Sequence, residues 1–155
     1  MPVSDHGTVS SEATDQAGIE AVVRTFFAAF VSGPECEARM DGLRDLFLPE
    51  AVIVRTCGPA PAVYDVDGFI APRKALLTSG ALQDFREWEE SGRTEVFGDI
   101  AQRISVYAKA GVQDGTPFSA RGMKVLQFVR TGAGWRISAA AWDDERDGLV
   151  LPASI

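Results

Sequence analysis

The stretch GWRIS at residues 134–138, followed by AWDDE at residues 141–145, decides the fold of this chain. It comes directly after VRTGA at residues 129–133, so two extended segments flank a turn that contains glycine. Side chains of a strand alternate between the two faces of a sheet, and short glycine-containing loops join neighbouring strands. The stretch therefore predicts a hairpin of residues 119–131 and 135–143, with its turn at residues 132–134.

The chain before this hairpin predicts further strands. They are rich in β-branched residues or alternate between apolar and polar side chains. Strands are predicted at residues 51–56, 84–90, 94–97 and 99–109. Gly92 and Gly98 predict bends of the kind that a curved sheet needs. Residues 57–62 contain one glycine and two prolines and are predicted to form a loop.

Three helices are predicted, and most of the strands follow them. Apolar residues recur at helical spacing from Ile19 to Phe30, and Asp15 is the predicted N-cap. A shorter helix is predicted for residues 40–47. A third is predicted for residues 67–77, where Pro72 requires a first-turn position or a kink. Helices followed by antiparallel strands predict an α+β fold.

The length of 155 residues suits one domain with a single core. We expect a mobile N-terminal tail at residues 1–14, one domain at residues 15–148 and a C-terminal tail at residues 149–155. The polar N-terminus is not a secretory signal, and no apolar run is long enough to span a bilayer. The two cysteines have no Cys-x-x-Cys spacing and favour reduced thiols. These features predict a cytoplasmic protein without a membrane partner.

The formal net charge is −7. An acidic surface repels phosphate backbones, so nucleic acid is not an expected partner. The one histidine, His6, lies in the predicted tail. Histidine-based acid–base chemistry and histidine metal sites are therefore disfavoured, and we predict no metal and no cofactor.

The chain resembles the nuclear transport factor two-like superfamily, which includes SnoaL-like polyketide cyclases and ketosteroid isomerases. The resemblance covers about residues 19–146. It is carried by LFLPEAV at 46–52, VFGDIA at 96–101 and VRTGAGWRI at 129–137. It implies a cone-shaped α+β barrel, with three helices packed on the concave face of a curved, mainly antiparallel sheet. It also implies a pocket at the open end and a homodimer, often formed through the outer sheet face.

The ketosteroid isomerase mechanism does not fit the matched positions. Those enzymes use a tyrosine of the first helix as an oxyanion donor and an aspartate after the first strand as the base. The matching residues here are Phe26 and Arg55. A phenyl ring donates no hydrogen bond, and a guanidinium is no base at neutral pH. That chemistry is therefore disfavoured.

The register of the hairpin decides which residues line the pocket. We favour the pairing in which Arg130 lies opposite Gly134 across a three-residue loop. Met123 then lies opposite Ala141, and Arg121 lies opposite Asp143. Ala139 then shares their face, and its methyl group leaves an apolar and roomy pocket floor. A slip of one residue would instead put three other side chains inside, those of Ser138, Ala140 and Trp142.

Candidate site residues follow from this register. The predicted ligand-binding residues are Phe26, Phe30, Arg55, Tyr64, Met123, Ala139 and Ala141. The predicted catalytic residues are Asp143, Glu87, Glu89 and Arg121, because a carboxylate near an apolar pocket can act as an acid or base. The alternative is that these residues form ordinary cross-strand salt bridges. Residues 143–145 are three consecutive acids, which favour a solvated strand end over a metal site.

Three functions stay open at this point. The first is a pocket that binds a small apolar organic molecule, uncharged or weakly acidic. The second is a lyase, cyclase or isomerase that uses a single pocket carboxylate. The third is a dimerisation or assembly module in which a partner chain buries Trp88 or Trp142. The fold hosts all three classes, so the sequence leaves open whether the protein is an enzyme.

Overall fold

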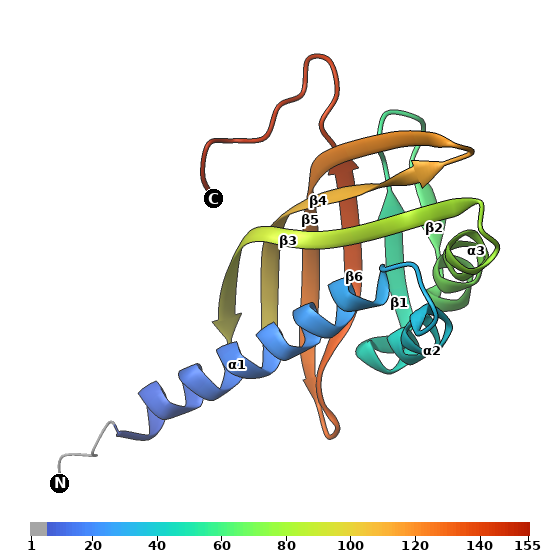
Figure 1. Cartoon of the computed structure of the whole chain (residues 1–155). Coiled ribbons are helices and arrows are strands. Elements are labelled where there is room, and N and C mark those ends of the chain that lie inside the picture. The colour runs from blue at the N-terminus through green and yellow to red at the C-terminus, as the bar shows by residue number, and fades with distance from the viewer. Residues whose placement is uncertain (1–5) are drawn as a thin grey trace, which may run out of the picture.

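The structure, a computed structural model, describes residues 6–155. Figure 1 shows helices that cover one side of a long, curved sheet. The helical elements are α1 (His6–Ala29), α2 (Cys36–Gly42), the 3-10 turn η1 (Leu43–Leu46) and α3 (Val66–Thr78). The strands are β1 (Phe47–Arg55), β2 (Ala62–Tyr64), β3 (Leu82–Phe97), β4 (Ile100–Gln113), β5 (Thr116–Thr131) and β6 (Gly134–Asp144).

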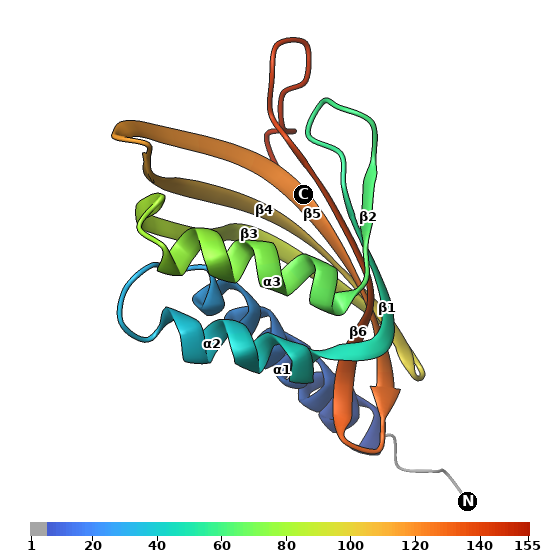
Figure 2. The same cartoon turned by 90° about the vertical axis from the view of Figure 1, so that its right-hand side faces the viewer.

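The strands form one mixed sheet in the order β2-β1-β6-β5-β4-β3. Neighbouring strands are antiparallel except β1 and β6, which are parallel. Figure 2 shows the sheet curving around the three helices on its concave side. The predicted α+β cone is therefore confirmed. The sheet is open, with β2 and β3 at its edges, and does not close into a barrel.

An aromatic core holds the helices against the sheet. Phe26 of α1 contacts Phe30 and Phe47, with ring centroids 5.1 and 6.3 Å apart. Phe69 of α3 contacts Trp142 of β6 at 5.6 Å. Aromatic rings bury a large apolar area and add about 0.5–1.5 kcal/mol per favourable pair. This cluster fixes α1 and α3 on the same face of β6.

Several predicted boundaries were wrong. Helix α1 begins at His6, so Asp15 lies inside it and forms an ion pair of 2.7 Å with Arg130 instead of capping the helix. Strand β1 begins at Phe47, where we predicted the end of a helix. Pro72 lies in the middle of α3 and not in its first turn. Residues 1–5 of the predicted N-terminal tail lie outside the described residues.

The predicted hairpin register was also wrong. Thr131, and not Arg130, pairs with Gly134, which shortens the turn to two residues. A second shift of one residue, between Gln127 and Phe128, places Met123 opposite Asp143. The two shifts together preserve the alternation of side chains, so Met123 and Asp143 still share a face. That face is the outer one, because its neighbours Lys124 and Trp142 are buried beneath the helices.

None of the helices within residues 6–155 is long and apolar enough to cross a membrane.

Gly122 provides a test of how tightly β4, β5 and β6 approach. A Cβ atom on Gly122 would overlap the Tyr107 hydroxyl and the Asp143 carbonyl oxygen. We expect Gly122→Ala to lower the free energy of unfolding by about 1–3 kcal/mol, as overpacking does, measured by urea denaturation. Gly132→Ala is the matched control, since nothing lies within 4 Å of its added Cβ. Equal stability of the two variants would contradict this packing.

Candidate functional site

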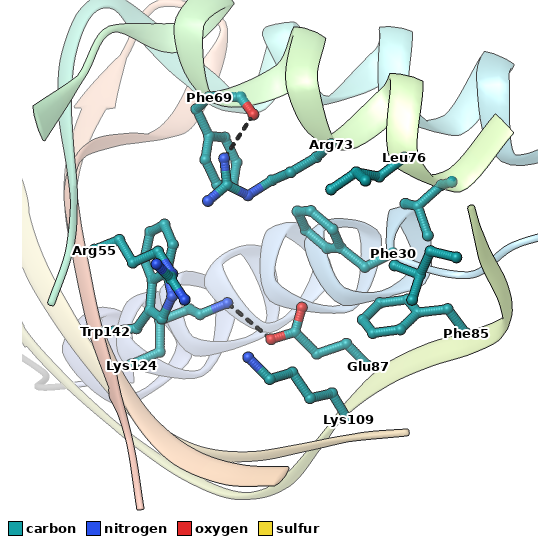
Figure 3. Close-up of a pocket in the computed structure, with 12 residues that line it drawn as sticks. Phe30, Arg55, Phe69, Arg73, Leu76, Phe85, Glu87, Lys109, Lys124 and Trp142 are labelled. Carbon is teal, nitrogen blue, oxygen red and sulfur yellow. Dashed lines mark hydrogen bonds and ion pairs between the residues drawn. The ribbon is translucent and has the colours of Figure 1, made fainter. Parts of the chain in front are cut away.

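A cavity of about 120 Å³ lies between α3 and the concave face of the sheet. Figure 3 shows side chains from both layers pointing into it. Its lining residues are Phe30, Arg55, Phe69, Arg73, Leu76, Leu77, Leu82, Phe85, Glu87, Lys109, Lys124 and Trp142. The curved sheet therefore encloses a pocket whose walls combine aromatic rings with several charged groups.

The charged groups of the cavity are mostly cationic. Arg55, Arg73, Lys109 and Lys124 line it together with a single carboxylate, Glu87. The formal net charge of the whole chain is −7. The cavity thus carries the opposite sign to the molecule as a whole. Such a concentration of charge in a low-dielectric hollow attracts anions.

Lys124 of β5 is the most deeply buried of these cations, with only 3% of its surface exposed. Its Nζ donates a hydrogen bond of 3.2 Å to Glu87 Oε1 on β3. Five aromatic rings surround the amine at 4.7–5.7 Å, those of Phe26, Phe27, Phe30, Tyr107 and Trp142. Burial lowers the pKa of Lys124, and the Glu87 carboxylate partly offsets this effect.

Arg73 of α3 faces Lys124 from the helical layer. Its guanidinium lies 4.3 Å from the centroid of the Phe69 ring and 5.3 Å from that of Trp142, and Nη1 donates to the Phe69 carbonyl at 3.0 Å. Burial lowers the pKa of Arg73. Within residues 6–155, no carboxylate lies at ion-pair distance from Arg73 or from Arg55. These two cations leave hydrogen-bonding capacity for a ligand.

Lys109 is held in place by a network behind the cavity. Its Nζ donates to Asp144 Oδ2 at 3.0 Å, and the fully buried Tyr107 hydroxyl donates to Asp144 Oδ1. Burial raises the pKa of Asp144, but the hydrogen bond from Tyr107 and the charge of Lys109 outweigh burial, so the net shift is downward. Burial, followed by the hydrogen bond to Asp144, raises the pKa of Tyr107. The network keeps Asp144 ionised and Tyr107 neutral.

The predicted ligand-binding residues divide between the two faces of the sheet. Phe30 and Arg55 line the cavity. Phe26 lies in the aromatic core next to Lys124, and Tyr64 lies beside Arg73. The remaining three, Met123, Ala139 and Ala141, belong to the outer face and not to the cavity. The apolar pocket floor that we predicted from these three is therefore wrong.

The predicted catalytic residues are also separated. Glu87 is the one that lines the cavity. Glu89 accepts hydrogen bonds from Arg103 and Ser105. Arg121 forms an ion pair of 2.6 Å with Glu90 and not with Asp143.

Asp143 is paired with Arg146, whose hydrogen bond lowers the pKa of Asp143. The predicted Arg121–Asp143 pair is therefore absent, since the register moves Met123 into that position. Of the neighbouring acids, Asp144 binds Tyr107 and Lys109, and Glu145 faces Arg121 at 3.6 Å. Each of residues 143–145 thus turns toward partners of its own. No group of three potential metal ligands occurs in the part of the chain that the structure describes.

Sequence reasoning missed Arg73, Lys109 and Lys124, and it placed Trp142 inside only in the alternative register, which the structure confirms for this residue. A signal for one of them was present. Lys124 alternates with Leu126 and Phe128, so a single cation stands on an otherwise apolar strand face. Lysine is almost never fully buried without a partner, which makes this position unusual.

Comparison with known proteins establishes the fold. No family model matches the sequence, and none of the curated proteins is similar enough in sequence to count as a match. Solved structures match over nearly the whole chain. An NTF2-like superfamily protein from Salmonella enterica is 13% identical with a TM-score of 0.70, and the match covers 91% of this chain and 99% of that one. The chain has the NTF2-like fold.

Two further structures agree. The Kfla4162 protein from Kribbella flavida is 18% identical with a TM-score of 0.71, over 87% of this chain and 93% of that one. An NTF2-like protein with a cystatin-like fold from Novosphingobium aromaticivorans is 18% identical with a TM-score of 0.67. That match covers 91% of this chain and 90% of the other. At such low identities the NTF2-like fold is what the chains share.

The Asp144 network predicts a dependence of stability on pH. The pKa of Asp144 is lower in the folded protein, so its ionised form stabilises the fold above the unfolded pKa of about 3.9. This contribution is lost as the pH falls through that value toward the folded pKa. We expect the free energy of unfolding to fall less steeply from about pH 5 to 3 in Asp144→Asn than in the wild type, measured by urea denaturation. The exposed Asp147→Asn is the control and should keep the wild-type slope.

Proposed function

We propose that the cavity binds a small organic anion, a carboxylic acid with a compact apolar body. The observation that carries this proposal is the charge of the lining, with four cationic side chains and one carboxylate. Lys109 and Lys124 have carboxylate partners in Asp144 and Glu87, whereas Arg55 and Arg73 have none within residues 6–155. A ligand carboxylate would supply the missing counter-charge.

Arginine suits this role for geometric reasons. Its planar guanidinium forms paired hydrogen bonds with a carboxylate, and charge-assisted bonds are stronger than neutral ones. Arg73 is held against the Phe69 ring at 4.3 Å, which fixes the plane of its guanidinium. A side chain fixed in this way loses little entropy when it binds a ligand.

The size of the cavity limits the ligand. A cavity of about 150 Å³ lined by apolar side chains is large enough to hold benzene. The cavity here, at about 120 Å³, fits a short aliphatic chain or most of one ring. Phe30, Phe85 and Leu76 supply the apolar wall for that part of the ligand.

This proposal refines the apolar, uncharged or weakly acidic ligand that we predicted from the sequence. The change follows from the cations that face inward in place of Ala139 and Ala141. The alternative of a lyase, cyclase or isomerase rests on Glu87, since it is the one predicted catalytic carboxylate that lines the cavity. Glu87 forms an ion pair with Lys124. Glu87 can therefore act as an acid or base only when a proton moves between these two side chains.

Benzoate and benzyl alcohol test the binding proposal, because they share a ring and differ in charge. We expect the wild type to bind benzoate more tightly, measured by calorimetry. Arg73→Leu should weaken benzoate binding by about tenfold or more, since a hydrogen bond to a charged group contributes about 1.5–3 kcal/mol. Benzyl alcohol should be little affected. The exposed Arg39→Leu is the matched control. Equal binding of both compounds to the wild type would refute the proposal.

We also propose that the protein forms a homodimer through the outer face of the sheet. An apolar row crosses four adjacent strands there, formed by Val54, Ala141, Val125 and Ile104 in register. Met123 and Ala139 flank this row on the same face. An extended apolar surface without helices over it favours association with a second copy.

A charge placed in the apolar row tests the dimer. We expect Val125→Glu to convert the dimer into a monomer at tens of micromolar, measured by light scattering after size exclusion, because the two-fold contact would bury both new carboxylates. Ala28→Glu adds the same charge at an exposed position of α1 and should remain dimeric. A monomeric wild type at this concentration would contradict the proposal.

A further inference from the structure

The amine of Lys124 lies at the wall of the cavity in surroundings that are unusual for a lysine. Its side chain is 4% exposed, and five aromatic rings enclose its Nζ. Glu87 is its one hydrogen-bond partner among the described residues. Figure 3 shows the amine reaching into the pocket toward Glu87, with Lys109 nearby. The amine is therefore screened from bulk solvent and open to a molecule in the cavity.

Burial lowers the pKa of Lys124 and so favours its neutral form, and two nearby cations act in the same direction. Glu87 faces it from β3, whereas Lys109 of β4 and Arg73 of α3 add positive charge on other sides. Arg55 of β1 lines the same cavity, and Asp144 is already engaged by Lys109. One carboxylate thus faces several cations within an apolar enclosure. Neutral amines are nucleophiles, and desolvation next to other cations is the environment that activates lysine.

We propose that Lys124 forms an imine with the carbonyl group of a small 2-oxo acid. This inference rests on the proposed function, because the same cavity must first hold the acid. The carboxylate would bind Arg73 and Arg55, and the adjacent carbonyl carbon would meet Nζ. Arg73 and Lys124 line the same cavity, and each lies 5.3 Å from the centroid of the Trp142 ring.

Glu87 is placed to move the protons of this reaction. It accepts one proton from the Lys124 ammonium, and the neutral nitrogen then attacks the carbonyl carbon. A second proton passes from nitrogen to the former carbonyl oxygen, which gives a carbinolamine. Glu87 returns its proton to this hydroxyl, the C–O bond breaks, and water leaves as the C=N bond forms. The product is a protonated imine, so the charge beside the Glu87 carboxylate is the same before and after the reaction.

Reductive trapping tests the inference in the wild-type protein. The chain has three lysines, Lys74, Lys109 and Lys124. Lys74 pairs with Asp41 at 2.7 Å, and Lys109 pairs with Asp144 at 3.0 Å. The protein is incubated with pyruvate and sodium cyanoborohydride, which reduces an imine to a stable amine, and the adduct is located by peptide mass spectrometry. We expect about tenfold or more adduct at Lys124 than at Lys74, since each unit of pKa changes the neutral fraction tenfold.

Two variants assign the reaction. Lys124→Arg keeps the charge, removes the nucleophile and should abolish the saturable adduct, whereas Lys74→Arg, which lies outside the cavity, should retain it. If the larger guanidinium prevents folding, Lys124→Met takes the place of Lys124→Arg. Circular dichroism checks that each variant is folded. Adduct that is distributed evenly over Lys74, Lys109 and the chain terminus would overturn the proposal.

Lactate distinguishes failure of this inference from failure of the proposed function. It has the carboxylate of pyruvate and a hydroxyl in place of the carbonyl, so it can bind but cannot form an imine. Binding of both acids without an adduct at Lys124 would refute the imine and leave anion binding intact. Binding of neither acid, with no adduct, would count against both. Binding of both acids, with the adduct at Lys124 formed from pyruvate alone, is the result that we expect.

Discussion

The burial of one ammonium group beneath an aromatic cluster is the constraint on which this structure depends. Desolvating a charge costs several kcal/mol, and the structure must offset that cost locally. Glu87 supplies the counter-charge at 3.2 Å, and the faces of five rings supply cation–π attraction. Glu87 and Lys124 lie on β3 and β5, which are separated by β4. They meet because the sheet curves, so the ion pair and the curvature support each other.

The cavity exists because polar groups occupy positions that a fully apolar core would fill. Trp142 and Phe69 pack edge to face, with ring centroids 5.6 Å apart. The guanidinium of Arg73 lies over both rings, at a position that a third aromatic side chain would occupy in an apolar core. On the concave face of β4, Tyr107 reaches Asp144 only because Gly122 has no side chain in its path. Asp144 then holds Lys109 at the cavity wall. A glycine on β5 thereby determines which charges face a ligand bound among β3, β4 and β6.

The sequence predicts the architecture well and the site poorly, and the reasons are physical. Glycine turns, strand alternation and the helical spacing from Ile19 to Phe30 are local patterns, so the α+β cone can be derived from them. The hairpin register depends on a tight turn at residues 132–133 and on the irregularity at Gln127, each of which moves the pairing by one residue. Neither shift has a clear local signal. Which face turned inward was decided by packing, where Trp142 and Phe128 outweigh the small Ala139 and Ala141. Glu87 could be predicted as a site candidate because it is a carboxylate. Its partner Lys124 could not, because lysine usually lies on the surface.

The alternation of side chains along β5 separates the two proposed roles of the protein, ligand binding and dimerisation. Lys124 points to the cavity, and its neighbour Val125 points to the apolar row on the outer face. The side chains of adjacent residues on one strand therefore lie on opposite faces of the sheet and do not contact each other. A ligand bound at Lys124 contacts α3 and the concave face, whereas a second copy would contact only the convex face. Association and ligand binding are then coupled only through the curvature of the sheet, so a change of charge on one face should leave the chemistry of the other largely unaltered.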